Sequence, residues 1–331
     1  MRIAFVWDWP PDYHQAMTWK DGLAAAIQIL SQRHEVSFFT MGNKTEVWKH
    51  PFFDIQVCCE SDVLKTMVAG FMPDVILHWA DCTRPNARPL AELGYPMALC
   101  FAGGDPMGPT MQYFDHFFVE SEVYREQFEV AGVSVSTAFG TNTDVFKPIP
   151  WMRKHFATIF PATYCEWKRH YLFTEATKGW RNLTCGFMYG EHERDCWEET
   201  MKAGVMTLPH VSAEVLAMLY ASSEVCLVTS KASGGSQRTV LEAMACGVPV
   251  VVTSDGKGAE YVEDAQKLGF FVGKTCEPEA TALREAVEST VKSTLDSGCQ
   301  LSQGVEYIAS KWTHNHYADA LERGMLGLIN Q

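Results

Sequence analysis

Residues 230–255 read SKASGGSQRTVLEAMACGVPVVVTSD, a pattern that predicts a loop, a helix and a buried strand. An apolar strand ends at Ser230, a helix extends from about Ser236 to Cys246, and Gly247 follows it. Serine is suited to cap a helix N-terminus, and glycine is suited to the left-handed conformation after the last turn. A strand, a glycine-containing loop and a helix N-terminus in this order form an anion site, because the first N–H groups of the helix lack intrahelical partners.

The loop before this helix carries residues that favour phosphate binding. Gly234 and Gly235 let an anion approach the backbone. Ser236 and Gln237 begin the helix, and Arg238 in its first turn can add a charge-assisted hydrogen bond. A cation there opposes the helix dipole unless an anion is bound, which favours the functional interpretation. A plain helix cap with a solvated arginine is the alternative.

Glu242 lies within the otherwise apolar helical segment TVLEAMACG. A buried carboxylate without partners is costly, so Glu242 must either face solvent or accept hydrogen bonds. A ribose diol would donate such hydrogen bonds. An exposed position on the helix explains the pattern equally well, and both interpretations stay open.

On both sides of this segment, apolar strand-like runs alternate with helical patterns. The runs lack strict polar alternation, which indicates parallel sheets that helices cover on both faces. They are residues 2–8, 35–41, 53–59, 74–80, 96–103, 116–121, 133–140, 156–163, 182–188, 205–211, 224–230 and 248–254. Two prolines in KPIPW, residues 147–151, exclude a continuing helix. We therefore predict an α/β chain with domains 1–148 and 149–304, and a helical tail, 305–331, that packs back across the junction.

Composition restricts the class of protein. The 331 residues carry a net charge of −13, which argues against general binding to nucleic acids or anionic membranes. The eleven cysteines include no CxxC pair and often lie in apolar runs, so a reducing compartment is predicted. The N-terminal segment lacks the apolar core of a signal peptide, and no run reaches membrane-spanning length. We expect a soluble cytoplasmic protein with no transmembrane segment.

The segment VLEAMACGVPVVVTSDGKGAEYV, residues 240–262, resembles the donor-site signature of GT-B glycosyltransferases of family 4. Further matches follow the family's order along the chain: HEVSFFT, DVILHW, FGTNTDVFKP and VSAEVLAMLYASSEVCLVTS. The resemblance implies a GT-B fold, in which two Rossmann-like domains place parallel sheets across a cleft. It assigns acceptor binding to residues 1–148 and donor binding to residues 149–304. It also implies retention of anomeric configuration without a metal.

The resemblance assigns roles to several residues of the second domain. Glu242 matches the family's second motif glutamate, which binds the donor ribose, whereas Gly234 stands where the first glutamate belongs. In FPATYCEWKRH, residues 160–170, Lys168 matches a lysine aimed at the diphosphate. Thr163 stands where the family has an arginine, for which Arg169 or Arg238 can compensate. We also expect Lys168 and Arg238 to stabilise the charge of the leaving diphosphate.

Three further positions complete the expected site. Val211 falls where the family's loop lies against the nucleobase. His78, at the end of DVILHW, matches a histidine near the reacting sugar, although a structural role explains it equally well. Gly22 opens or interrupts the first helix and can lie near the donor phosphates. We assign His78, Lys168 and Arg238 to catalysis. The residues assigned to donor binding are Gly22, Arg169, Val211, Gly234, Gly235, Ser236, Gln237 and Glu242.

The resulting expectation is a hexosyl- or pentosyltransferase that uses a nucleoside diphosphate sugar, UDP- or GDP-linked, and needs no cofactor or metal. The acceptor and the oligomeric state stay open, and a nucleobase in viral DNA is one specialised acceptor. The alternatives are an epimerase or hydrolase of the same fold and a catalytically silent nucleotide-sugar-binding protein. The replacement of the acidic residue by Gly234 favours the silent protein. GFFVGKT, residues 269–275, resembles a phosphate-binding loop but is one residue too short between its glycines.

Overall fold

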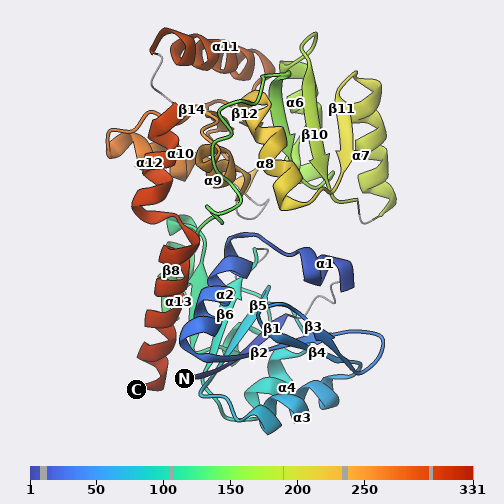
Figure 1. The fold of residues 1–331 in the computed structure, drawn as a ribbon, viewed down its shortest axis with the longest axis vertical. Helices are drawn as coiled ribbons and strands as arrows, with labels where there is room; N and C mark the ends of the chain where they lie inside the picture. Colours follow the sequence, from blue (N-terminus) through green and yellow to red (C-terminus); the bar gives the residue numbers. More distant parts are fainter. Residues whose placement is uncertain (8–12, 104–106, 189, 233–237, 298–300, 331) are drawn as a thin grey trace. The chain divides into compact units, whose positions relative to one another are not determined.

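The computed structural model describes residues 1–331 apart from 8–12, 104–106, 189, 233–237, 298–300 and 331. The chain divides into two compact units, Met1–Gly140 with His314–Gln331 and Thr141–Thr313 (Figure 1). Each unit consists of a mainly parallel sheet with helices on both faces, which confirms the predicted α/β fold class.

The described residues of the first unit form an eight-stranded sheet in the order β3-β4-β2-β1-β5-β6-β7-β8. All neighbouring strands are parallel except β3 and β4. Its elements are β1 (Arg2–Trp7), α1 (Tyr13–Thr18), α2 (Gly22–Arg33), β2 (Glu35–Met41), β3 (Glu46–Lys49), β4 (Asp54–Cys58), α3 (Ser61–Phe71), β5 (Val75–Ala80), α4 (Ala87–Ala91), β6 (Met97–Phe101), η1 (Met111–Tyr113), β7 (His116–Val119), α5 (Glu122–Val130), β8 (Val135–Thr137) and α13 (His314–Ile329).

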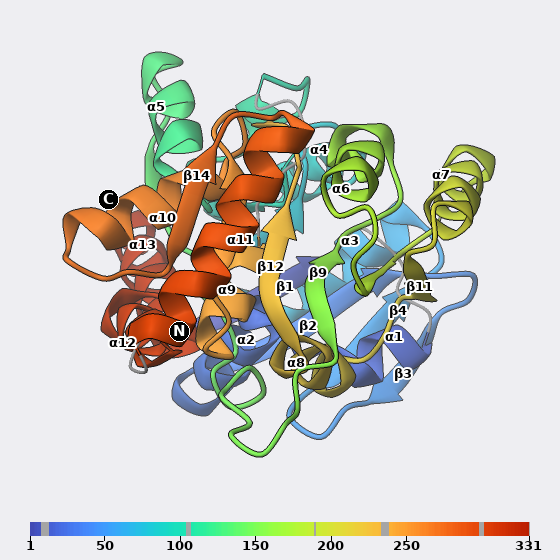
Figure 2. The same ribbon diagram turned by 90° about the horizontal axis from the view of Figure 1, so that it is seen from above.

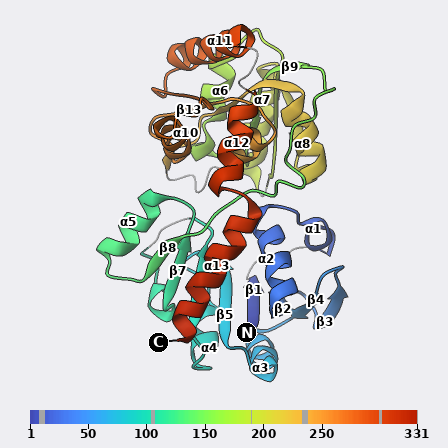
Figure 3. The ribbon, with the colours of Figure 1, turned by 60° about the vertical axis from the view of Figure 1, so that its left-hand side comes forward.

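The central strands of this sheet are buried because their residues are apolar on both faces. β6, MALCF, is buried at every position. Side chains from α3, α4 and α5 form a hydrophobic core with one face of the sheet. Helix α13 lies beside α2 over the sheet (Figure 3). The continuous apolar runs of the sequence thus correspond to strands covered on both sides.

The described residues of the second unit form a six-stranded parallel sheet in the order β11-β10-β9-β12-β13-β14. Its elements are β9 (Phe156–Pro161), η2 (Glu166–Lys168), α6 (His170–Ala176), β10 (Asn182–Gly186), α7 (Glu191–Lys202), β11 (Met206–Pro209), α8 (Ala213–Ala221), β12 (Ser223–Val228), α9 (Arg238–Ala245), β13 (Val250–Thr253), α10 (Gly258–Lys267), β14 (Gly273–Cys276), α11 (Ala280–Ser297) and α12 (Leu301–Lys311).

The strand order reverses at β9, since the chain continues first to β10 and β11 on one side and later to β12 on the other. Helices α6, α7 and α11 pack together on one face of this sheet, and α8, α9 and α10 cover the other. Figure 2 shows α11 lying along the sheet near β12 and β14. Gly247, after α9, has a φ of 71°, as the predicted helix stop requires.

The tail does not form the single helix that the sequence pattern predicted for 305–329. It forms α12, which packs on α9, and α13, which packs on α2, with a break at Trp312 and Thr313. The break has a physical cause: the Trp312 carbonyl accepts a hydrogen bond from the Thr141 amide at 2.8 Å, and Thr141 pairs with Thr313 in a β-bridge. Backbone groups used in this way cannot continue a helix.

Candidate functional site

A cavity of about 250 Å³ lies within the second unit at the carboxyl ends of β9, β10 and β11. The loops after these strands and the first turn of α9 line it. This edge includes the point where the strand order reverses, which is where open α/β sheets bind ligands.

Gly186, the last residue of β10, allows the two central loops to approach each other. A Cβ atom at Gly186 would lie 1.8 Å from the carbonyl oxygen of Ala162 in the loop after β9. Both residues line the cavity. Any side chain at Gly186 would therefore push apart the loops that form the cavity wall.

Two cations line the cavity. Lys168 ends the short helix η2 after β9, and Arg238 begins α9. Among the described residues, no acidic side chain contributes to the lining, whereas Thr163 adds a hydroxyl group. The cations and the positive end of α9 make this wall favourable for a phosphate group.

An aromatic pair contributes to another part of the lining. The rings of Phe187, after β10, and His210, after β11, are stacked with centroids 3.8 Å apart and planes 15° apart. Removal from water lowers the pKa of His210, so its ring is neutral at pH 7. Val211 and Leu216 line the cavity with this pair. A flat, uncharged surface of this kind suits an aromatic ligand group.

Glu242 is buried on α9, one turn beyond Arg238 and Thr239. Its side chain is 5% exposed and accepts a hydrogen bond of 3.2 Å from the Tyr220 hydroxyl. It does not line the cavity. Of the two interpretations of the sequence, the solvated glutamate is wrong, because the carboxylate is buried with a hydrogen-bond donor.

Arg169 does not line the cavity, although its neighbour Lys168 does. The Arg169 guanidinium is buried and forms a two-pronged ion pair with Asp255, with both N···O distances 2.7 Å. It also donates to Thr253 Oγ1 at 2.8 Å and to the Thr229 carbonyl. Arg169 therefore binds residues that do not line the cavity, and its side chain connects the segments after β9, β12 and β13.

The two residues of the expected site that belong to the first unit, His78 and Gly22, are both buried. His78 is fully buried in β5, with its ring 5.7 Å from that of Phe114 in the core of that unit. Gly22 is buried at the start of α2, where the Asp21 side chain caps the helix by accepting from the Ala24 amide at 2.8 Å.

The expected phosphate loop itself, Gly234, Gly235, Ser236 and Gln237, lies outside the described residues. Phe187, His210 and Gly186 line the cavity but were not predicted from the sequence. Each stands at the end of a parallel strand or within the next residue. That position is the signal that could have found them.

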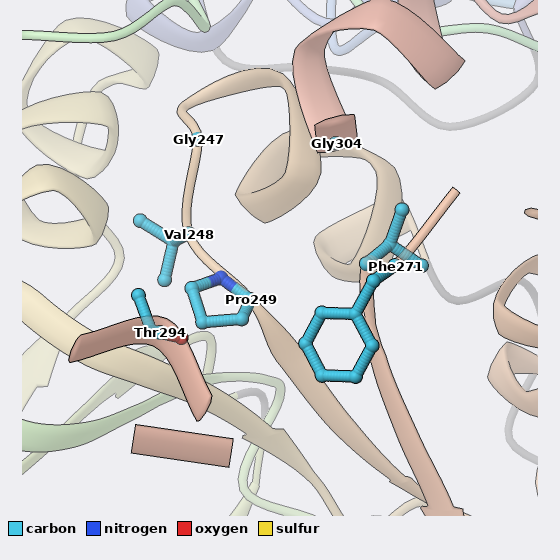
Figure 4. A pocket seen from close by; sticks show the side chains of 7 residues that line it. Gly247, Val248, Pro249, Phe271, Thr294 and Gly304 are labelled. Carbon is cyan, nitrogen blue, oxygen red and sulfur yellow. The ribbon is translucent and has the colours of Figure 1, made fainter. Parts of the chain in front are cut away.

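A much smaller cavity lies beneath the start of β13 (Figure 4). Its residues are Gly247, Val248, Pro249, Phe271, Val272, Thr294 and Gly304. Its volume of about 10 Å³ is close to the minimum for a single water molecule, so it cannot hold a substrate.

Two features are absent from the described residues. Within them, no group of three or more His, Cys, Asp or Glu side chains is arranged to hold a metal ion. None of their helices combines the length and apolar character needed to cross a membrane.

Residues 157–292 match the family model of the Glycosyl transferases group 1. This segment includes the cavity and its lining residues. No curated protein sequence matches the chain.

Solved structures with the same fold cover nearly the whole chain. Sucrose-phosphate synthase from Thermosynechococcus elongatus is 14% identical, with a TM-score of 0.74 and coverage of 98% of both chains. Anabaena HepE in complex with UDP and glucose is 15% identical, with a TM-score of 0.74 and coverage of 99% of this chain and 100% of its own. Trehalose 6-phosphate synthase from Burkholderia multivorans is 10% identical, with a TM-score of 0.72 and coverage of 98% and 96%.

Proposed function

We propose that this chain is a glycosyltransferase of group 1 and that it binds a nucleoside diphosphate sugar in the cavity of its second unit. The observation that carries the proposal is that Lys168 and Arg238 line the same cavity as the Phe187–His210 pair. A nucleoside diphosphate has one anionic end and one flat aromatic end, which match these two surfaces.

The diphosphate binds at the cationic wall in this proposal. Lys168 supplies a point charge from the β9 side, and Arg238 supplies a planar donor from α9. Both cations then stabilise the charge that develops on the diphosphate as the sugar leaves.

The nucleoside binds at the other part of the cavity. The base lies against Phe187, His210 and Val211. The ribose lies near α9, where its hydroxyl groups donate to Glu242 in place of, or together with, Tyr220. A carboxylate offers about four lone-pair sites, so Glu242 can accept hydrogen bonds from a diol as well as from the Tyr220 hydroxyl.

We further propose a UDP-linked hexose as the donor and a retaining reaction without a metal. UDP and glucose occupy the Anabaena structure, which supports the choice of donor. The acceptor hydroxyl can pass its proton to the leaving phosphate, so no protein base is assigned.

The described cysteines are free thiols, which supports a cytoplasmic location. Gly234 in place of an acidic residue favours one alternative, a protein that binds the donor without transfer.

The Lys168→Ala variant tests the phosphate assignment. Loss of a charge-assisted hydrogen bond costs about 1.5–3 kcal/mol, so UDP affinity should fall roughly 10- to 100-fold. Uridine affinity should stay unchanged, because uridine carries no phosphate. Isothermal calorimetry with both ligands measures the two effects. Lys202→Ala, on the exposed surface of α7, is the control; equal losses for UDP and uridine in Lys168→Ala would contradict the assignment.

A further inference from the structure

Arg169 adopts a backbone conformation that is costly for its residue type. Its φ of 54° and ψ of 48° place it in the left-handed region at the junction of η2 and α6. Such a conformation is unfavourable for a non-glycine residue, so the surroundings must hold it in place. The ion pair with Asp255 and the hydrogen bonds to Thr253 and Thr229 do so.

Residues that follow β12 hold the backbone next to Arg169 in place. The Thr229 hydroxyl lies 2.8 Å from the Lys168 carbonyl oxygen and 3.1 Å from that of Arg169. The Lys231 amide donates to the Trp167 carbonyl at 2.9 Å. The Trp167 carbonyl thus accepts from the Lys231 amide, and the single Thr229 hydroxyl proton is shared between the Lys168 and Arg169 carbonyls.

Asp255 lies in the segment after β13 and connects it to the segments after β9 and β12. The Ala232 amide donates to the Asp255 carbonyl at 3.0 Å, and Thr253 Oγ1 lies 3.3 Å from the Ser230 carbonyl oxygen. The Arg169 side chain is 5% exposed and that of Asp255 is 43% exposed. The Arg169 guanidinium holds the pKa of Asp255 below its usual range, so the pair stays ionised at neutral pH.

We infer that Arg169, Asp255 and Thr229, here termed the switch-point cluster, position Lys168 for the diphosphate of the proposed donor. The inference rests on the proposed function. The cluster joins the segments after β9, β12 and β13, and it contacts Lys168, which lines the cavity, through the Thr229 hydroxyl. A lysine side chain on a fixed backbone loses less entropy when it binds an anion. Arg169 is thus a positioning residue, and Lys168 makes the contact.

The Asp255→Asn variant tests this role, because asparagine keeps the side-chain shape and removes the charge. UDP affinity should fall roughly 5- to 20-fold while uridine affinity stays unchanged. The double variant Lys168→Ala/Asp255→Asn should bind UDP no more weakly than Lys168→Ala alone. Such non-additivity would show that Asp255 acts through Lys168. A general loss of stability would not produce non-additive losses of UDP affinity.

Two further variants distinguish a loss of Lys168 positioning from a general loss of stability. Thr229→Val removes the hydroxyl beneath Lys168, leaves the ion pair in place, and should give a smaller loss of the same UDP-selective kind. Glu288→Gln breaks the exposed pair with Arg284 in the same unit and should change neither affinity.

Equal losses for UDP and uridine in Asp255→Asn, or additive losses in the double variant, would overturn the positioning role. In that case a UDP-selective loss in Lys168→Ala would leave the proposed function standing. A wild-type protein that binds no nucleoside diphosphate would overturn both.

Discussion

At the residue scale, Lys168, Arg169 and His170 are three consecutive basic residues with three different environments. Lys168 lines the cavity, Arg169 is buried in an ion pair, and His170 is 1% exposed. The His170 ring packs against Tyr164 and Phe160, and neither of its nitrogens has a hydrogen-bond partner among the described residues. Burial, and then the charge of Lys168, lowers the pKa of His170 to about 3. Sequence alone does not separate these roles, because all three are basic residues of one short segment.

His170 should make the protein sensitive to acid. Its stabilising neutral form is fully present above the unfolded-state pKa of about 6.5, and the benefit is lost as the pH falls towards 3. Within this window the single histidine removes up to about 1.4 kcal/mol of unfolding free energy per pH unit. His170→Phe keeps an aromatic ring in the same cluster and removes the titration. Urea unfolding at pH 7 and pH 4.5 should therefore show a smaller acid loss in His170→Phe than in wild type.

The control for this prediction is His192→Gln, on the exposed surface of α7, which should lose stability with acid as the wild type does. An identical acid loss in His170→Phe and the wild type would show that His170 does not carry the effect.

At the element scale, the last helix shows how one position can decide packing. Helix α13 contacts α2, where Arg33 pairs with Asp319 and Glu322 at 2.7 Å. Gly324 of α13 faces β7: a Cβ there would lie 2.4 Å from the buried ring of Phe118. Gly327, one turn later, has no atom within 4 Å of such a Cβ.

The two glycines should respond in opposite directions to alanine. Gly324→Ala should destabilise the first unit by about 1–3 kcal/mol through overpacking. Gly327→Ala should stabilise it by up to about 1 kcal/mol through helix propensity. Thermal unfolding of both variants measures the difference, and each serves as the control for the other. A lower melting temperature for Gly327→Ala than for Gly324→Ala would contradict the packing of α13 on β7.

Most strands could be predicted from the sequence because long apolar runs in parallel sheets are distinctive. β2 coincides with the expected 35–41, and β9 and β10 begin at the expected residues. Two strands were missed for physical reasons. β3 is a short, partly exposed edge strand, and β14 begins within the glycine-containing GFFVGKT, which resembles a loop.

The site was only partly predictable. Lys168, Arg238 and Val211 were expected and line one cavity, since the order of motifs along the chain reports strand ends. The Arg169–Asp255 pair joins residues 86 positions apart, and no local pattern signals it. Phe187 and His210 each follow the end of a strand, which is a local signal, but they come from two different loops and no local pattern predicts that their rings stack.

At the scale of the whole molecule, both units are mainly parallel α/β structures, and the candidate donor cavity lies in the second. The second unit carries cations and an aromatic pair around one cavity, in a chain whose net charge is −13. Local positive charge in an acidic protein favours a small anionic ligand over a polyanion such as nucleic acid. This balance agrees with a nucleoside diphosphate sugar as the donor.

The most direct test of the central claim is the melting temperature of the protein with UDP, GDP, ADP, CDP and dTDP. Each nucleotide is added at several millimolar, above the usual KM range of about 1 μM–1 mM. One diphosphate, UDP in our proposal, should raise the melting temperature by several degrees, since a ligand at 100 times its Kd adds about 2.7 kcal/mol. The shift should be largely lost in Lys168→Ala. No shift with any of the five, or an equal shift in Lys168→Ala, would contradict the assignment of the cavity to a nucleotide donor.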